Sequence, residues 1–263
     1  MTNEGSMMLV RKVSQLFDRL AQGEASAAEL SEAVGEPRSS IYRLLSSLQA
    51  EGLVEQGSKR GQFRLGFKLL TLGTAVVSRF DEREFAQPVM ERLHDLTGET
   101  VFLCVRRGDE AVCIERLAGK RVQSLALQLG GSLPLHAGAA SRALLAFAPE
   151  TEWEAYLQRN QPLSRFTAST PSEPGALRKL LRQARTDGCT ISDQDVTVGV
   201  AAIGVPVVDY RGDVRAAVSI SGVRESILGD DYERWREALI EAGNEVSRAL
   251  GVQLAGQNIA RFS

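Results

Sequence analysis

The 263-residue chain has few of the residues that build metal sites and disulfide frameworks. It has three cysteines and two histidines, with no CxxC or HxxxH spacing, so a structural zinc site and a disulfide framework both lack their ligands. No run of 18 uncharged apolar residues occurs, and no basic stretch followed by an apolar one opens the chain, so neither a membrane span nor a secretory signal is expected. These absences predict a cytoplasmic protein without a metal or other cofactor.

What is present is the composition of a soluble globular protein. Hydrophobic residues make up 43% and charged residues 24%, and the length suits two domains. The net charge of −2 argues against a nucleic-acid partner until the chain is divided: residues 1–80 carry ten Lys and Arg against eight Asp and Glu, and the remainder carries 21 against 25. Six of the ten cations lie between Arg38 and Lys68, so a basic footprint is present locally.

Three helices are predicted in the first 52 residues. Apolar residues recur at helical spacing from Val10 to Leu20. A capping box at Ser26 and Glu29 predicts the start of a second helix, which Gly35 ends. The third helix is expected to have Ser39 as its cap, to end near Gly52 and to carry the apolar stripe Ile41, Leu44, Leu45 and Leu48.

The outer face of this third helix suits DNA better than water, because its polar residues are small or hydrogen-bonding instead of the usual mixture of Glu and Lys. Two short strands, 53–56 and 62–65, follow around a glycine-flanked turn with two cations at its tip. This order is the plan of a winged helix-turn-helix, and a small helical domain with a solvated face is the alternative. The expected DNA contacts are Arg38, Ser39, Ser40, Tyr42, Arg43, Lys59 and Arg60.

Residues 67–81 predict a linker helix that is apolar on more than one side and must therefore be covered. We expect it to pack against a second subunit, which would also supply paired DNA half-sites; packing on its own domain is the alternative. The predicted organisation is a winged helix-turn-helix over 1–66, a linker and dimerisation helix over 67–81, and a second domain over 82–263.

The second domain alternates helices and strands. Helices are predicted over 84–97, 137–148, 174–187 and 232–250, and strands over 100–106, 111–116, 124–129, 203–208 and 214–221. Antiparallel hairpins with helices between them indicate an α+β fold. In the first hairpin a symmetric turn places Cys104 opposite Cys113 on one sheet face. Two buried thiols are the ordinary interpretation of this pair, and a redox switch is the other.

An ordered set of motifs resembles the isocitrate lyase regulator (IclR) family of bacterial transcription factors over nearly the whole chain. These motifs are Ser39–Leu45, Gly52, Phe63–Gly66, Leu133–Ala137, Gly199–Asp209 and Ala217–Gly222. The resemblance implies a winged helix-turn-helix joined by a helix to a GAF-like effector-binding domain. It also implies homodimers or homotetramers that bind double-stranded operator DNA. They are expected to repress or activate a metabolic operon, most naturally a catabolic one, when a small metabolite binds.

A pocket for a small organic acid is expected in the second domain. The loop Gly130–His136 runs into the helix predicted at Ala137, whose free N–H groups and positive dipole end favour a carboxylate. Ser219 and Ser221 share one face of a strand and need partners there; bonds to each other or to the backbone are the alternative. The resemblance implies effector contacts at Ala139, Ala140, Ser192, Ala202, Ser219 and Ser221, with apolar walls at Val122, Leu125, Leu133 and Val200.

The chain departs from the family pattern next to this pocket. Ser141-Arg142 stands where Gly-Lys is common, and the acidic run is reduced to Ser192–Asp195, which leaves the effector open. Few charges and aliphatic walls suit a small or aromatic carboxylic acid. Two other functions stay open. One is a DNA-binding oligomer without an effector. The other is an enzyme using His136 with Ser141 or Cys104, against which the absence of a nucleophile elbow, a P-loop and a dinucleotide fingerprint argues. We expect His136 to cap the loop or the helix start.

Overall fold

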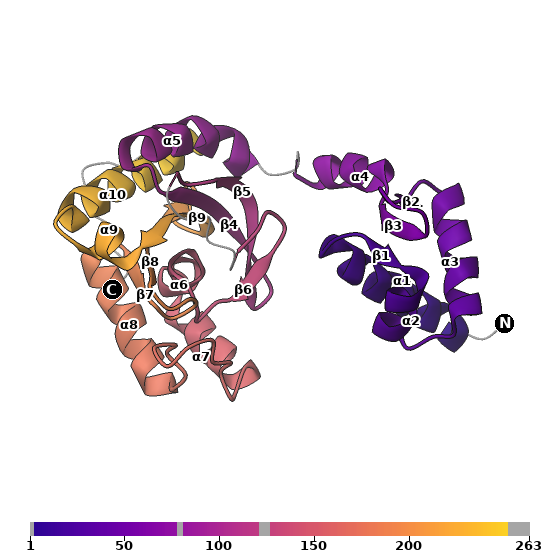
Figure 1. The fold of residues 1–263 in the computed structure, drawn as a ribbon. Coiled ribbons are helices and arrows are strands. Elements are labelled where there is room, and N and C mark those ends of the chain that lie inside the picture. Colours follow the sequence, from indigo (N-terminus) through magenta and orange to yellow (C-terminus); the bar gives the residue numbers. More distant parts are fainter. Residues whose placement is uncertain (1–2, 78–80, 121–126, 252–263) are drawn as a thin grey trace. The chain divides into compact units, whose positions relative to one another are not determined.

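The chain divides into two compact units, residues 1–79 and 80–263 (Figure 1). The structure is a computed structural model that describes residues 3–77, 81–120 and 127–251. Each unit buries apolar side chains of its own and therefore has its own hydrophobic core. None of the described helices is long and apolar enough to cross a membrane.

The amino-terminal unit combines helices with a small antiparallel sheet. Its elements are α1 (Asn3–Ala21), β1 (Ala25–Ser26), α2 (Ala27–Val34), α3 (Arg38–Ala50), β2 (Val54–Gln56), β3 (Gln62–Leu65) and α4 (Phe67–Val77). Strand β3 lies between β1 and β2. Leu16 of α1, Leu30 of α2 and Ile41 of α3 are buried in one core. This core fixes α3 by its apolar stripe and leaves its polar side outward.

Two helix starts in this unit test the sequence prediction. The capping box is confirmed: the Glu29 N–H donates to the Ser26 hydroxyl, and the Ser26 N–H donates to the Glu29 carboxylate. The predicted cap of the third helix is wrong, because Pro37 and not Ser39 is the N-cap residue. The Pro37 carbonyl accepts the N–H groups of Ser40 and Ile41, so α3 begins at Arg38 and contains Ser39.

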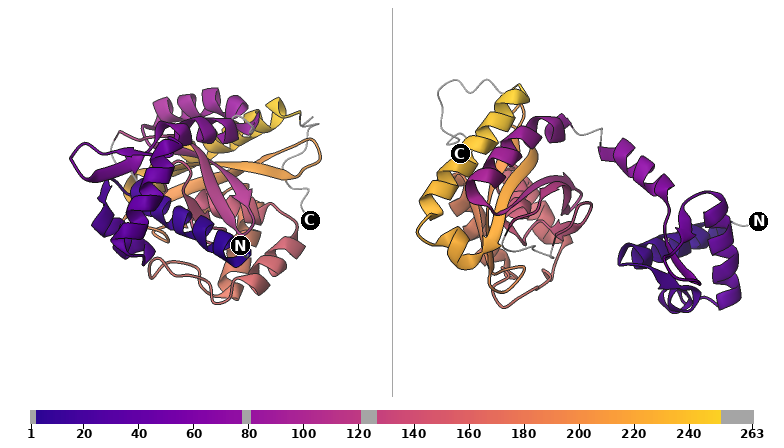
Figure 2. Two further views of the ribbon diagram at one scale, coloured as in Figure 1. Left: turned by 90° about the vertical axis from the view of Figure 1, so that its right-hand side faces the viewer. Right: turned by 45° about the horizontal axis from the view of Figure 1, so that its top comes forward.

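The carboxy-terminal unit confirms the α+β class. Its elements are α5 (Asp81–Thr97), β4 (Thr100–Arg107), β5 (Glu110–Leu117), β6 (Ser132–Pro134), α6 (Ala139–Ala146), α7 (Glu150–Arg159), α8 (Pro174–Asp187), β7 (Thr190–Asp193), β8 (Val200–Val208), β9 (Val214–Val223), α9 (Arg224–Leu228) and α10 (Tyr232–Ala249). Within the described residues the strands form one antiparallel sheet in the order β6-β5-β4-β9-β8-β7. Helices α5 and α10 lie side by side (Figure 2).

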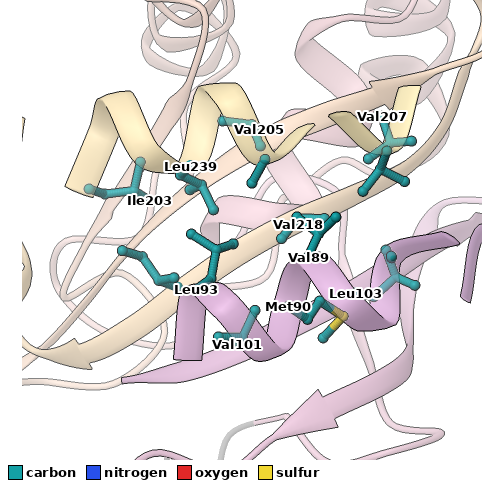
Figure 3. Packing of buried hydrophobic residues seen from close by; sticks show 14 of the residues in the cluster. Val89, Met90, Leu93, Val101, Leu103, Ile203, Val205, Val207, Val218 and Leu239 are labelled. Atoms are coloured by element: carbon teal, nitrogen blue, oxygen red, sulfur yellow. The ribbon is translucent and has the colours of Figure 1, made fainter. Parts of the chain in front are cut away.

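Helices cover both faces of this sheet. On one face Leu103 and Val218 of the strands pack with Leu93 of α5 and Leu239 of α10 (Figure 3). On the other face Phe102 packs in a second core with residues of α6, α7 and α8. The two cores are separated by the alternation of side chains along each strand, which puts neighbours such as Phe102 and Leu103 on opposite faces.

The predicted hairpin register is confirmed. Cys104 of β4 pairs with Cys113 of β5, and both free thiols are buried. A shift in register between Leu103 and Cys104 places Leu103 opposite Glu115, which the symmetric turn did not predict. The two thiols fill space in the second core.

Other differences from the predicted elements lie around the pocket described below. The predicted loop 130–136 contains strand β6, which pairs with β5. Helix α6 begins at Ala139 instead of Ala137, because the Ala137 N–H bonds to the Pro134 carbonyl in a turn. The sequence predicted neither α7 nor β7. Of the predicted strand 124–129, residues 124–126 lie outside the described residues, and 127–129 form no strand.

Helix α6 approaches the sheet closely at Gly204 of β8. A Cβ at this position would lie 2.7 Å from the carbonyl carbon of Ala139, in the first turn of α6. Every residue of α6 is buried, so the helix has no free side toward which it could move. The missing side chain of Gly204 therefore sets the position of the start of α6.

We expect Gly204→Ala to lower the free energy of unfolding by about 1–3 kcal/mol, because the added methyl group overpacks a buried backbone contact. Urea unfolding followed by tryptophan fluorescence measures this unit alone, since both tryptophans, Trp153 and Trp235, belong to it. Gly175→Ala is the matched control. Its Cβ would meet nothing within 4 Å, so stability should be equal or slightly higher. Equal midpoints for the two variants would contradict the close approach.

Candidate DNA-binding surface and effector pocket

The residues predicted to contact DNA lie on α3 and on the turn between β2 and β3. Arg38, Ser39, Tyr42, Arg43, Lys59 and Arg60 are exposed, and Ser40 is half-buried. The ion pairs of this unit use other cations, namely Lys12, Arg19, Arg64 and Lys68. Within the described residues, the cations at 38, 43, 59 and 60 therefore form no ion pair, and their charge stays available to phosphates.

Glu24 holds the basic turn in place, and the sequence analysis missed it. Its carboxylate accepts the Ser58 hydroxyl at 2.7 Å and the Ser58 N–H at 2.9 Å. These side-chain and backbone hydrogen bonds hold the pKa of Glu24 below its usual value. Gly57 leaves the space for this contact, since a Cβ there would lie 2.7 Å from Glu24 Oε2. The turn with Lys59 and Arg60 is thus anchored to the segment between α1 and α2.

The carboxy-terminal unit contains a pocket of about 480 Å³, its open mouth included. Eight residues expected to contact an effector line it: Leu133, Ala139, Ala140, Ser192, Val200, Ala202, Ser219 and Ser221. The other two, Val122 and Leu125, lie outside the described residues. Further lining residues that were not predicted are Phe102, Leu127, Gly138, Ser141, Val196 and Thr197. Among the described residues, no charged side chain lines the pocket.

The register of four strands brings one wall of the pocket together. Phe102 of β4 pairs with Ser219 of β9, while Ser221 of β9 pairs with Ala202 of β8, which pairs with Ser192 of β7. Paired residues point to the same face of a sheet, and residues two apart on one strand do so as well. The hydroxyl groups of Ser192, Ser219 and Ser221 therefore lie on one sheet face with the ring of Phe102 and the methyl group of Ala202.

The two serines of β9 differ in their hydrogen bonds. The Ser221 hydroxyl donates to the Ala201 carbonyl at 3.2 Å, so the alternative of a backbone partner applies to it. Ser219 is 3% exposed and has no hydrogen bond to any other described residue. Because Ser219 lines the pocket and no described group occupies its hydroxyl, it is the stronger candidate for a ligand contact.

The first turn of α6 forms a second wall of the pocket. Gly138 is its N-cap residue, with φ 86° and no side-chain cap. The first bond of the helix runs from the Arg142 N–H to the Gly138 carbonyl. The N–H groups of Ala139, Ala140 and Ser141 precede this bond and have no partner within the helix. They offer neutral donors to an anion at the positive end of the helix dipole.

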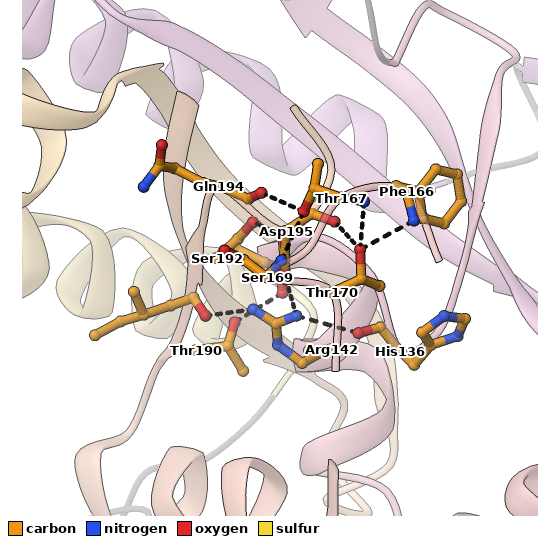
Figure 4. A network of polar contacts seen from close by, with 12 residues as sticks. His136, Arg142, Phe166, Thr167, Ser169, Thr170, Thr190, Ser192, Gln194 and Asp195 are labelled. Carbon is orange, nitrogen blue, oxygen red and sulfur yellow. Dashed lines mark hydrogen bonds and ion pairs between the residues drawn. The ribbon is translucent and has the colours of Figure 1, made fainter. Parts of the chain in front are cut away.

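A buried ion pair lies behind both walls (Figure 4). Arg142 of α6 and Asp195 have side chains that are each 3% exposed, and Arg142 Nη1 pairs with Asp195 Oδ2. The guanidinium also donates to the carbonyls of His136, at 3.1 Å, and Ile191. Asp195 Oδ1 accepts the hydroxyl of Ser192, which itself lines the pocket. The pair thus links α6, β7 and the segment that follows β7.

Further hydrogen bonds fix the segment 194–199, of which two residues line the pocket. The Thr170 hydroxyl donates to the Asp195 carbonyl at 2.6 Å, and the Thr167 hydroxyl donates to the Gln194 carbonyl at 2.7 Å (Figure 4). Gln194 has φ 59°, a backbone conformation that residues other than glycine rarely adopt without such support. The wall formed by this segment is therefore held by its backbone.

His136 does not cap α6, which corrects the sequence prediction. Because α6 begins at Ala139, the ring lies elsewhere: Nε2 donates to the Ser164 carbonyl at 2.8 Å, and Nδ1 accepts the Tyr156 hydroxyl at 2.7 Å. Burial lowers the pKa of His136 and raises the pKa of Tyr156 to about 12. Both ring nitrogens are occupied, so neither can activate Ser141 as a nucleophile.

We expect Asp195→Ala to lower the free energy of unfolding by about 3–5 kcal/mol, because it leaves the buried guanidinium of Arg142 unpaired. The double variant Arg142→Met with Asp195→Leu should lose less, since no buried charge remains. Glu154→Ala is the control: it breaks the exposed pair with Arg178 and should change stability much less than Asp195→Ala does. Urea unfolding measures all three. A single Asp195→Ala variant as stable as the double variant would contradict the burial of the pair.

Known bacterial regulators share both units. Residues 10–58 match the family model described as the IclR helix-turn-helix domain, and residues 74–248 match that of the bacterial transcriptional regulator IclR C-terminal. The HTH-type transcriptional repressor AllR of Salmonella typhimurium is 35% identical over 253 residues, covering 95% of this chain and 92% of that protein.

Solved structures of IclR proteins resemble this chain over most of its length. The crystal structure of Thermotoga maritima IclR matches with a TM-score of 0.77 and 30% identity, over 93% of this chain and 99% of that one. The crystal structure of an IclR homolog from Microbacterium hydrocarbonoxydans, complexed with 4-hydroxybenzoate, matches with a TM-score of 0.78 and 28% identity, over 93% and 98%. The curated relatives are named as regulators and repressors, not as enzymes. With both halves matched, the chain belongs to the IclR family of DNA-binding transcriptional regulators.

Proposed function

We propose that this regulator senses a small organic acid, which binds in the pocket of the carboxy-terminal unit and changes the affinity for operator DNA. The observation that carries the proposal is the chemistry of the pocket wall. Three free N–H groups at the start of α6 and the unpartnered hydroxyl of Ser219 line one pocket that is otherwise mainly apolar. Neutral donors in an apolar pocket suit a carboxylate on a small carbon skeleton.

One structural relative supports a small acid. The Microbacterium homolog was crystallised with 4-hydroxybenzoate, an aromatic carboxylic acid. We infer a ligand of similar size for this chain, with apolar contacts from Phe102, Leu133 and Val200.

For DNA we propose that α3 enters the major groove. Tyr42 and Arg43 then reach base edges or phosphates, and Lys59 and Arg60 neutralise phosphates from the anchored turn. Ser39 and Ser40 lie at the amino end of α3, where their short side chains allow the backbone to approach, and Arg38 beside them reaches a phosphate.

We further propose a homodimer, or a dimer of dimers, formed through α4. Phe67, Leu70 and Leu72 of this helix are 72%, 65% and 50% exposed in the single chain, which favours a second subunit as their cover. Effector binding would favour one arrangement of the carboxy-terminal units, and α4 would transmit this change to the DNA-binding units. The spacing of the two α3 helices would then match or no longer match the operator of a metabolic operon, which we propose is catabolic.

We expect Arg43→Ala to weaken operator binding about tenfold and to leave effector affinity unchanged. The operator is first selected from fragmented genomic DNA with the purified protein, and affinity is then measured at several salt concentrations. If Arg43 contacts a phosphate, the slope of log affinity against log salt falls by about one. Arg178→Ala removes an exposed cation of the other unit and should change neither value. Equal operator affinity of Arg43→Ala and the unmodified protein at every salt concentration would refute the placement of α3.

For the pocket we expect Ser219→Ala to weaken effector binding about tenfold, and Ser221→Ala to have a smaller effect because its hydroxyl is bound to the Ala201 carbonyl. A thermal-shift screen of small organic acids identifies binders by the rise in unfolding midpoint, and calorimetry then gives affinities. Operator binding without effector should be unchanged in both variants. The proposed pocket fails if no acid binds, or if Ser219→Ala titrates like the unmodified protein.

A further inference from the structure

We infer that Ser192, oriented by the buried ion pair, makes one side of the pocket a hydrogen-bond acceptor and thereby selects hydroxycarboxylic acids over simple carboxylic acids. The inference rests on the proposed function, because it concerns the ligand of the same pocket. It assigns to Ser192 a role in specificity and to Asp195 a role in positioning Ser192.

The direction of the Ser192 hydroxyl follows from its partner. A serine hydroxyl has one hydrogen to donate and two lone pairs that accept. Ser192 Oγ contacts Asp195 Oδ1, and the other oxygen of this carboxylate pairs with Arg142. A carboxylate paired with a guanidinium accepts hydrogen bonds and donates none, so the hydrogen of Ser192 points to Asp195. What Ser192 presents to the pocket is therefore a lone pair.

This orientation is held from outside the pocket. Arg142 and Asp195 do not line the pocket, and their side chains are each 3% exposed. The carbonyls of His136 and Ile191 hold Arg142, and Thr170 holds the backbone of Asp195 (Figure 4). A ligand that enters the pocket meets Ser192 without reaching the ion pair, so it encounters a hydroxyl whose hydrogen is already engaged.

Other polar groups of the pocket have the opposite character. The first N–H groups of α6 can donate and cannot accept, and the Ser219 hydroxyl, without a partner among the described residues, is free to donate. Donors thus come from α6 and from Ser219 of β9, and an acceptor comes from Ser192 of β7. Ser221 of β9 is a second acceptor, because its hydrogen is bound to the Ala201 carbonyl. A ligand satisfies both when it turns a carboxylate to the donors and a hydrogen-bond donor to Ser192.

The chemistry of the pocket favours a neutral donor, of which a hydroxyl group is the smallest. An ammonium group would carry a full charge into a pocket whose described lining has no carboxylate, which is unfavourable. A simple acid would leave the lone pair of Ser192 facing apolar carbon, and an ether would bring two acceptors together. The geometry therefore points to a hydroxycarboxylic acid of small size.

The experiment compares ligands that differ by one hydrogen-bonding group. The probes are 3- and 4-hydroxybenzoate and 3-hydroxybutyrate, each measured by calorimetry on the full-length protein against its deoxy acid and its methyl ether. We expect at least one hydroxy acid to bind about tenfold tighter than both of its analogues. Tight binding of the ether would contradict the orientation of Ser192, because only a hydroxyl free to rotate would donate to the ether oxygen.

Two variants locate the preference. In Ser192→Ala the hydroxy acid and its deoxy analogue should bind within about twofold of each other, because the acceptor is lost. Ser219→Ala is the matched control: it should weaken both acids by the same factor and keep their ratio. A merely structural role of Ser192 would alter both affinities and leave this ratio unchanged. Thermal unfolding without ligand checks that both variants are folded.

The outcomes separate this inference from the proposed function. Tight binding of acids with equal affinity for hydroxy acid, deoxy acid and ether would overturn the role of Ser192 and leave the organic-acid sensor intact. A preference for the hydroxy acid that persists in Ser192→Ala would overturn it as well. If neither these probes nor any acid of the thermal-shift screen binds or changes operator affinity, both proposals fail together.

Discussion

The position of the candidate pocket depends on the ion pair between Arg142 and Asp195, which joins α6 to β7 and the segment after β7 across 53 residues of sequence. Burying two charges costs solvation free energy that their attraction only partly returns, so the pair is a weak source of net stability. Its value lies in geometry. With its charge in the middle of a fully buried helix, Arg142 needs a fixed partner, and that partner fixes the segment 194–199 over the pocket.

A second constraint acts on the same helix from the sheet. A glycine inside a strand weakens the strand, yet Gly204 lies in β8, between β7 and β9. The structure shows the reason: the backbone of Ala139 occupies the space that a side chain would take. The helix start therefore reaches the sheet face on which Ser219 and Ser192 lie. Without this approach the free N–H groups and the hydroxyls would belong to separate surfaces.

The parts of the fold that local signals determine could be predicted from the sequence. The capping box of α2, the boundaries of α8 and the pairing of Cys104 with Cys113 depend on residues close together in the chain, and the structure confirms them. The α3 surface followed from the unusual polarity of one helix face. The start of α6 was misplaced by two residues, because a turn at Pro134 competes with the helix for the same backbone groups.

The parts that depend on distant partners could not be predicted. Nothing near Glu24 indicates that Ser58 is its partner, and Asp195 gives no sign of pairing with Arg142 across 53 residues. Phe102 joins the pocket through the pairing of β4 with β9, which sequence alternation does not reveal. Most of the pocket residues were named through resemblance to a family, and their alignment along one face needed the register of four strands.

The two units use charge in opposite ways, and this difference explains what each can recognise. In the amino-terminal unit, the cations of α3 and of the basic turn form no ion pair among the described residues. They therefore attract an anionic polymer in any register, and added salt weakens this attraction. In the carboxy-terminal unit, Arg142, Arg159 and Arg224 are paired with Asp195, Asp109 and Asp193. The described lining of the pocket is left with neutral hydrogen-bond donors and acceptors. Such groups distinguish small anions by the positions of their hydrogen-bonding groups and not by their charge. A protein that must select one metabolite among many acids needs discrimination of this kind.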